Sequence, residues 1–368
     1  MEVSFSRLQL IFLLLLSLGI SNHVLIIPHL IQAAGRDAWI SIIVAYLVLI
    51  GWSVILYVIL RSMRTSPLDS WLIERIGKFG SRIVTGGLAF YLLIAGTLII
   101  FDTVKNINIY FLPHTPNLVI TLTFILLSYN AARSGLKTLI YLSAALLPLV
   151  WILGFGVSSM TMSSKDYGML YPVFTEGILP DIRGGAIVFG GSMDLLIILL
   201  LQYKLKKPLN YGTLFVLLTI LIGLIMGPTI GATAAFGPFQ AGNMRFPAFE
   251  QWRLVMLGRQ ISHVDFLAVF QLMSGSVLRT ALIIHLVSET LGGRSIKPIF
   301  RQSLMLSVTA IMSLPTLMEL SDILVQKLIH NYFYTYSLWF GIIITGILLA
   351  AVCLPKKKKG GKANESVT

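Results

Sequence analysis

Long apolar runs recur along this chain and constrain its fold more than any other feature. The first extends from Leu8 to Trp39 and is long enough to cross a bilayer, which needs ~20 apolar residues in a helix. With 56% hydrophobic and 12% charged residues, the 368-residue chain is far more apolar than a soluble domain, so the bilayer must be its solvent. The runs predict an all-α membrane protein with about ten transmembrane helices. Their approximate ranges are 8–33, 38–60, 83–108, 117–130, 136–159, 185–203, 211–236, 262–290, 299–316 and 334–353.

Polar and helix-weakening residues interrupt the first run in its middle. Gly19 is followed there by Ser21, Asn22 and His23, and Pro28 lies just beyond them. Burial of Asn or His in hydrocarbon is costly unless partners are supplied, and Gly and Pro weaken the helix on both sides. We therefore expect two half-helices with an unwound centre, which in transporters marks the binding site.

The sixth expected span contains a similar interruption. Gly190, Gly191 and Ser192 stand just before the acidic Asp194 within an otherwise apolar run. Interrupted spans at matching positions in two halves of a chain predict an inverted-repeat fold with a ligand site at the membrane midplane. The alternative is that the two glycines only allow helices to pack closely.

Basic residues predict the orientation of the spans. The loops expected on the cytoplasmic side hold most of them, including Arg61, Lys78, Lys204 and the run that begins at Lys356. Positive charge is retained on the cytoplasmic side of membrane proteins, so both termini are expected there. The basic loops and the C-terminal tail, which give the chain much of its net charge of +13, then face anionic lipid headgroups. Nucleic acid is not expected as a partner.

The chain divides at its longest expected extracytoplasmic loop. Residues 1–160 form the predicted first five-helix repeat, 161–184 the loop, 185–353 the second five-helix repeat, and 354–368 a basic cytoplasmic tail. Between the second and third spans, the segment SPLDSWLIERIGKFG at 66–80 has apolar residues at helical spacing. It is either a short amphipathic helix in the membrane interface or an ordinary polar loop.

Two charged residues are expected near mid-depth. By helical rise, Asp194 lies about 15 Å into the membrane from Lys204, and Arg279 lies about 20 Å in from Gly292. A lone charge there costs ~3 kcal/mol on insertion scales, so a direct pair, or a pair bridged by a zwitterionic ligand, is expected. The alternative is that backbone carbonyls meet Arg279 and water meets Asp194.

Hydroxyl groups accompany Arg279 on the eighth span. Ser274, Ser276 and Thr280 are candidate ligand contacts, although such hydroxyls usually bond their own helix backbone.

Other ionisable residues are expected to have structural roles. Asp102 and Lys105 are expected to form a pair near the outer surface. His285 and Glu289 share a helix face and form either a simple hydrogen bond or a proton relay.

The sequence gives no support for an enzyme, a cofactor or a metal site. It contains no phosphate-binding P-loop, no nucleophile elbow and no His pair at metal-ligand spacing. Its single cysteine, Cys353, excludes a disulfide framework.

Several segments taken in order resemble a known family. They are IIPHLIQAAGRDAWIS, LIERIGKFG, YPVFTEGILPDIRGG, and the acidic residue of the sixth span followed by a lysine-rich loop. This order is similar to the B subunit of spore germinant receptors, the GerAB-type spore permeases of the amino acid/polyamine/organocation superfamily. The resemblance implies a LeuT-like 5+5 inverted repeat with broken helices one and six, A and C partner subunits, and the spore inner membrane. It also implies that Tyr91 of the third span faces the site, although a lipid-facing or core-facing ring is an equal alternative.

Two functions are compatible with these features. The first is a receptor subunit that binds a small nutrient, such as an amino acid, and passes a conformational change to its partners. The second is a secondary transporter of an amino acid or amine coupled to protons or sodium. The same scaffold serves both purposes.

Overall fold

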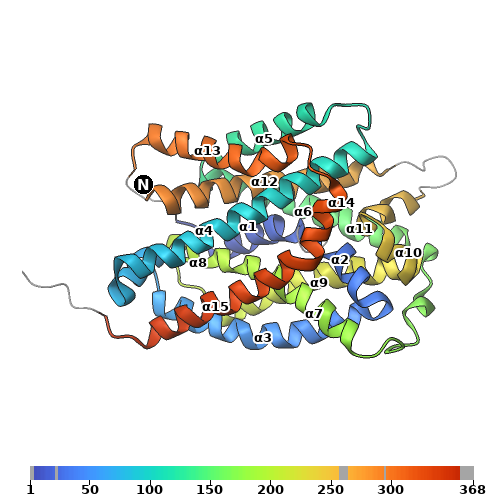
Figure 1. Ribbon diagram of the computed structural model, residues 1–368, viewed down its shortest axis with the longest axis horizontal. Coiled ribbons are helices and arrows are strands. Elements are labelled where there is room, and N and C mark those ends of the chain that lie inside the picture. Colours follow the sequence, from blue (N-terminus) through green and yellow to red (C-terminus); the bar gives the residue numbers. More distant parts are fainter. Residues whose placement is uncertain (1–3, 21–23, 257–263, 294–295, 357–368) are drawn as a thin grey trace, which may run out of the picture.

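Helices make up almost all of the regular structure (Figure 1). The computed structural model describes residues 4–20, 24–256, 264–293 and 296–356. Within those ranges the only β-structure is an isolated parallel bridge between Phe5 and Leu205. The all-α prediction is therefore confirmed for the described chain.

The elements of the first half are joined by short connections. They are α1 (Arg7–Ile20), α2 (Ile26–Ala34), the 3₁₀ turn η2 (Gly35–Asp37), α3 (Ala38–Met63), α4 (Leu68–Tyr110), α5 (Asn117–Arg133) and α6 (Leu136–Met160). Two 3₁₀ turns, η3 (Met162–Ser164) and η4 (Tyr167–Leu170), lie in the connection to the second half.

The second half contains more short elements than the first. They are α7 (Leu179–Ser192), η5 (Met193–Ile197), α8 (Ile198–Leu201), η6 (Gln202–Lys204), α9 (Tyr211–Phe236), α10 (Pro238–Asn243), α11 (Pro247–Glu250), η7 (Gln251–Leu254), α12 (Phe266–Gly292), α13 (Pro298–Leu317), α14 (Asp322–Leu328), the π-helical η8 (Ile329–Phe333) and α15 (Tyr334–Cys353).

Seven helical stretches in the described residues are long and apolar enough to cross a membrane. They are Ile26–Met63, Leu68–Tyr110, Leu136–Met160, Leu179–Lys204, Tyr211–Phe236, Phe266–Gly292 and Asp322–Cys353. The other expected ranges are also helical, but their helices are shorter or more polar. Arg7–Gly19 is apolar and short. The 17 residues of α5 extend about 26 Å, less than the ~30 Å of a hydrocarbon core, and α13 carries Arg301 and several hydroxyl groups.

The stretch from Leu179 to Lys204 lies at the centre of the molecule. In its most apolar window 89% of the residues are buried, against 22% for Leu136–Met160. The α7 helix packs against α2, α3 and α15, while α12 packs against α1, α4, α5, α6 and α13. Of the charged residues expected at mid-depth, Asp194 directly follows α7 and Arg279 lies on α12.

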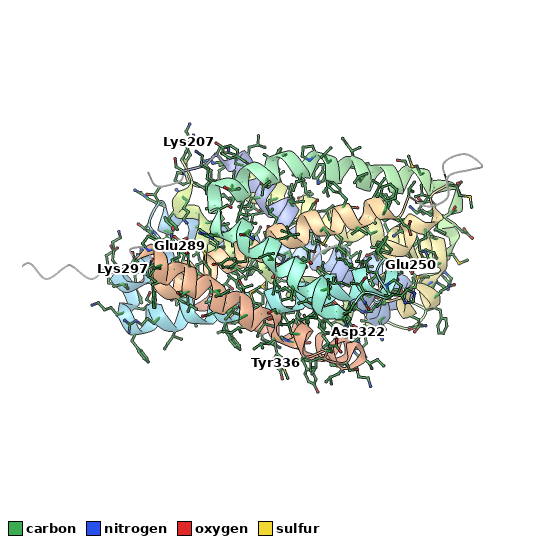
Figure 2. The ribbon with its side chains drawn as sticks, turned by 90° about the horizontal axis from the view of Figure 1, so that it is seen from above. Lys207, Glu250, Glu289, Lys297, Asp322 and Tyr336 are labelled. Carbon is green, nitrogen blue, oxygen red and sulfur yellow. The ribbon has the colours of Figure 1, made fainter. Side chains whose placement is uncertain are left out.

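The molecule has two chemically different ends. Lys207, Glu289 and Lys297 lie at one end, which we call the basic end, and Glu250 and Asp322 lie toward the other, which we call the loop end (Figure 2). The spans connect these two ends.

Both ends of the described chain lie at the basic end. The backbone N–H of Phe5 donates to the carbonyl of Lys204 at 3.1 Å, and Lys356 Nζ lies 3.4 Å from a carboxylate oxygen of Glu74. The first and last described residues therefore lie on one side of the molecule.

The segment 66–80 is helical from Leu68 onward, so the alternative of a polar loop is wrong. It forms the first turns of α4, and Gly77 (φ 82°, ψ 174°) then kinks the helix, a conformation that costs glycine least. Trp71 and Leu72 are fully buried in the protein core, and the Arg75 guanidinium lies over the Trp71 ring at 4.3 Å. The apolar face of this segment thus packs largely on the protein itself.

Candidate functional site

A buried ion pair joins the two central helices. Asp194 lies in η5 directly after α7, and Arg279 lies in the middle of α12. Arg279 Nη2 is 2.6 Å from Asp194 Oδ2, and both side chains are nearly inaccessible. Charges transferred from water into a membrane protein need a partner, and here each supplies the other. Of the arrangements expected from the sequence, the structure contains the direct pair.

Tyr91 completes this group, which we call the central cluster (Tyr91, Asp194, Arg279). Its hydroxyl donates to Asp194 Oδ1 at 2.8 Å, so both carboxylate oxygens are engaged. The Tyr91 ring stacks on Phe340 at 5.2 Å between centroids and lies parallel to Phe333 at 6.5 Å. Tyr91 is therefore buried inside the protein against Asp194, and the alternative of a lipid-facing ring is wrong.

A small cavity lies beside the central cluster. Its volume is about 20 Å³, and its lining includes Gly191, Asp194 and Arg279 together with Asp102 and Tyr334. A cavity of this size holds about one water molecule. A molecule larger than water can enter only if the surrounding helices move.

The two glycines of the sixth span lie in continuous helix, which corrects the expectation of an unwound break. Residues through Ser192 are α-helical, and the helix tightens to 3₁₀ from Met193 without an extended residue. A Cβ on Gly190 would collide with the backbone carbonyl of Tyr334. A Cβ on Gly191 would meet the side chain of Ile26. These glycines allow close helix packing, which was the alternative expectation.

The remaining candidate residues are dispersed. Thr103 donates to Ser276 between α4 and α12 at 2.9 Å, whereas Ser192 and Ser274 donate to carbonyls of their own helices. Thr280 is fully buried next to Arg279 in the sequence. Ser21, Asn22 and His23 lie outside the described residues.

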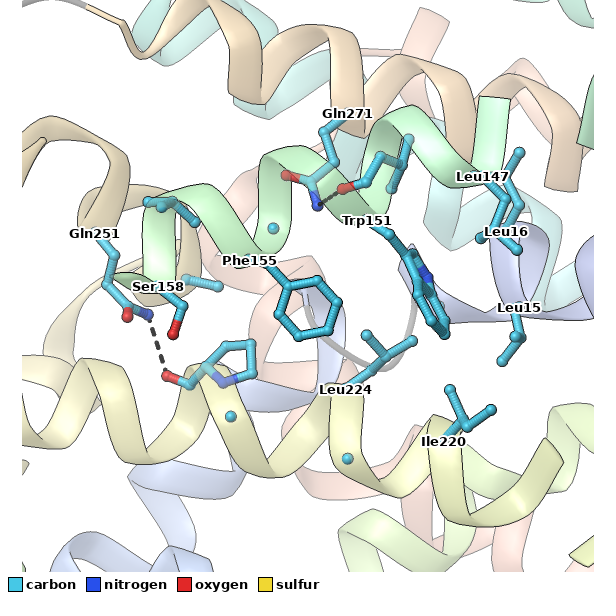
Figure 3. Close-up of a pocket in the computed structure, with 18 of the residues that line it drawn as sticks. Leu15, Leu16, Leu147, Trp151, Phe155, Ser158, Ile220, Leu224, Gln251 and Gln271 are labelled. Atoms are coloured by element: carbon cyan, nitrogen blue, oxygen red, sulfur yellow. Dashed lines mark hydrogen bonds between the residues drawn. The ribbon is translucent and has the colours of Figure 1, made fainter. Parts of the chain in front are cut away.

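Gly19 lines a different and much larger cavity, of about 430 Å³ (Figure 3). The cavity lies between α6 and α9 and is closed by parts of α1, α11, η7 and α12. It shares no lining residue with the small cavity. The structure thus separates Gly19 from the other glycines of the predicted site.

A network of ion pairs joins several elements at the loop end of the molecule. Arg245, between α10 and α11, contacts Asp102 of α4, and its Nε donates to Asp322 Oδ2 at 3.0 Å. Burial acts to lower the pKa of Arg245, but the two carboxylates outweigh burial and hold that pKa above its ordinary value. The expected pair of Asp102 with Lys105 is therefore wrong, and the Lys105 ammonium lies 5.6 Å from the Phe101 ring centroid.

A second network lies at the basic end. Lys204 Nζ is 2.6 Å from Glu289 Oε2, and the hydroxyl of Tyr203 also donates to this carboxylate. His285 Nε2 lies 3.6 Å from the same carboxylate, too far for a good hydrogen bond. Glu289 thus pairs mainly with Lys204, where the sequence suggested His285.

Comparison with known proteins decides the family. The family model described as "Spore germination protein" matches residues 4–322. The chain belongs to the spore germination protein family. It is 33% identical over 351 residues to Spore germination protein XB of Bacillus anthracis, covering 95% of this chain and 98% of that protein. It is also 27% identical over 238 residues to Putative spore germination protein YfkT of Bacillus subtilis (strain 168), covering 65% and 64%.

For this spore germination protein, sequence reasoning missed the residues that pack around the central cluster. Phe333 ends the π-helical η8 and Tyr334 begins α15, whereas Arg245 lies in a connection between short helices. In the sequence, Arg245 entered only the distribution of basic residues, as one residue of an expected outer loop. The available signal in the sequence was the position of Asp102 within an apolar run, because a charge there needs a strong partner.

Proposed function

We propose that this spore germination protein is the nutrient-sensing membrane subunit of a germinant receptor and that a small nutrient binds at the central cluster. The observation that carries the proposal is the fully buried contact of Tyr91 and Arg279 with Asp194 beside a cavity lined by Gly191. A buried ion pair is weak evidence for stability, because well-packed apolar residues serve that purpose as well. A binding role accounts for its presence inside a membrane protein.

The chemistry of the pair favours a zwitterionic ligand such as an amino acid. An ammonium group can replace Arg279 at the Asp194 carboxylate, and a carboxylate can replace Asp194 at the Arg279 guanidinium. The exchange keeps every buried charge neutralised. It also requires α7 and α12 to separate, because the present cavity admits only about one water molecule.

Separation of the central helices couples binding to a signal. A ligand that binds only the separated arrangement shifts the population toward it. The networks of Arg245 at the loop end and Glu289 at the basic end would then report the change to partner A and C subunits. We further propose a LeuT-like inverted repeat of residues 1–160 and 185–353, with both termini in the cytoplasm of the spore inner membrane.

Reconstitution of the full-length chain in liposomes separates this function from transport. Each common amino acid is presented, and binding and uptake are measured together. We expect saturable binding of one or a few amino acids without accumulation inside the vesicles, since the signal is passed to partners. Accumulation driven by a proton or sodium gradient would instead assign the chain to the transporters.

A further inference from the structure

The larger cavity has the dimensions of a ligand site. Its volume of about 430 Å³ lies within the roughly 300–1,000 Å³ of small-molecule pockets. Its walls belong mainly to α6 and α9, both of which are apolar enough to span a membrane. It shares no lining residue with the small cavity, so the two cavities are separate sites.

The lining changes from apolar to polar along the cavity (Figure 3). Leu15, Leu16 and Leu147 lie at one end, and Ser158 and Gln251 lie at the other. The Gln251 amide donates to the Pro228 carbonyl at 3.1 Å and is held in place by it. This gradient matches an amphiphile whose chain points toward the apolar end.

The mouth of the cavity lies between α6 and α9, where some of the lining residues are exposed. Phe155 of α6 is 69% exposed there, and Gly223 and Gly227 of α9 are also exposed. These surfaces belong to spanning helices, so the mouth meets lipid rather than water. Lipid chains can enter by this route, whereas a charged nutrient cannot enter without losing its hydration.

Lys165 lies next to the polar end of the cavity without lining it. Lys165 Nζ lies 3.4 Å from the carbonyl of Ser158, and no carboxylate within the described ranges pairs with it. A Cβ on Gly231 would contact Lys165 Cε at 3.4 Å and collide with the Gln251 amide, so these side chains converge on Gly231. Partial burial lowers the pKa of Lys165.

We propose that this cavity is a lipid site, which holds one acyl chain of an anionic phospholipid between α6 and α9 with its phosphate at Lys165. The apolar end at Leu15 and Leu16 receives the chain, and Ser158 and Gln251 meet the glycerol region. The bound lipid fills a space that would otherwise weaken the packing of α1 against α6 and α9.

Fluorescence quenching of Trp151, which lines the cavity, tests this site. The full-length chain is placed in vesicles that contain rising fractions of phosphatidylglycerol or phosphatidylcholine with brominated acyl chains. The share of quenching due to Trp151 is the difference between the wild type and Trp151→Phe. We expect this share to saturate at a several-fold lower fraction of phosphatidylglycerol than of phosphatidylcholine. Lys165→Gln should reduce the preference about five-fold, the factor for one basic residue at a membrane surface.

A matched pair of glycine variants identifies the location. Gly227→Leu places a side chain in the mouth, and Gly346→Leu places one on α15; neither position has an atom within 4 Å of the added Cβ. Gly227→Leu should remove the saturable quenching, and Gly346→Leu should retain it. Quenching of Trp151 that rises in proportion to both lipids would overturn the proposal. Displacement of the brominated lipid by a common amino acid would do the same, because the cavity would then be the nutrient's.

Discussion

Reversing either charge of the central pair, Asp194→Arg or Arg279→Asp, should destabilise the protein by about 3–5 kcal/mol. Each single reversal places two like charges in contact where the native pair is 2.6 Å apart and nearly inaccessible. The double reversal restores opposite charges and should recover part of the loss. Recovery stays partial because the Tyr91 hydroxyl, which donates to Asp194, would face an arginine.

Thermal unfolding in detergent and abundance in the membrane measure the effect of these reversals. If the double variant is more stable than the sum of the two single losses predicts, the two charges interact with each other. Strictly additive losses would show that each charge is stabilised by other groups.

Gly190→Ala is expected to disrupt the centre of the fold although it adds one methyl group. The added Cβ would collide with the Tyr334 backbone carbonyl, and backbone cannot rotate away as a side chain can. Overpacking of this kind costs typically ~1–3 kcal/mol, and the contact with backbone places this variant at the upper end. Gly191→Ala should cost less, because its contact is the flexible side chain of Ile26.

Gly185→Ala is the matched control on the same helix. Its added Cβ lies 3.6 Å from the carbonyl of Ser41, which is ordinary van der Waals contact. Membrane abundance and unfolding temperature should fall for Gly190→Ala and stay near wild type for Gly185→Ala. Equal behaviour of the two variants would contradict the close packing of α7 on α15.

The helix positions and the central pair could be predicted because each depends on a local property. Apolar length fixes where helix is needed, and helical rise places Asp194 and Arg279 at similar depth. The Gly190–Gly191 dipeptide was ambiguous, since glycine permits both an unwound turn and close packing. Only the position of Tyr334 on another helix decides between them.

Contacts made by connecting segments could not be predicted. Arg245 reaches Asp102 across more than a hundred residues of sequence, from a connection that no periodic pattern describes. Lys105, three residues from Asp102, was the nearer partner by sequence but lies against Phe101 instead. Pairing of charges far apart in the chain follows from how the helices assemble, which no single segment encodes.

The nutrient response of spores that carry Tyr91→Phe tests most directly whether the central cluster is the sensing site. This variant removes one hydroxyl from Asp194 and keeps the ring that stacks on Phe340. Tyr46→Phe is the control, because it removes a hydroxyl that bonds Thr219, and neither residue lines the small cavity beside the cluster.

The measurement is the nutrient concentration for half-maximal germination, in spores with equal amounts of the protein. A hydrogen bond to a charged group contributes about 1.5–3 kcal/mol, so we predict a change of roughly ten-fold or more for Tyr91→Phe and little change for Tyr46→Phe. An unchanged half-maximal concentration for Tyr91→Phe would contradict nutrient sensing at the central cluster.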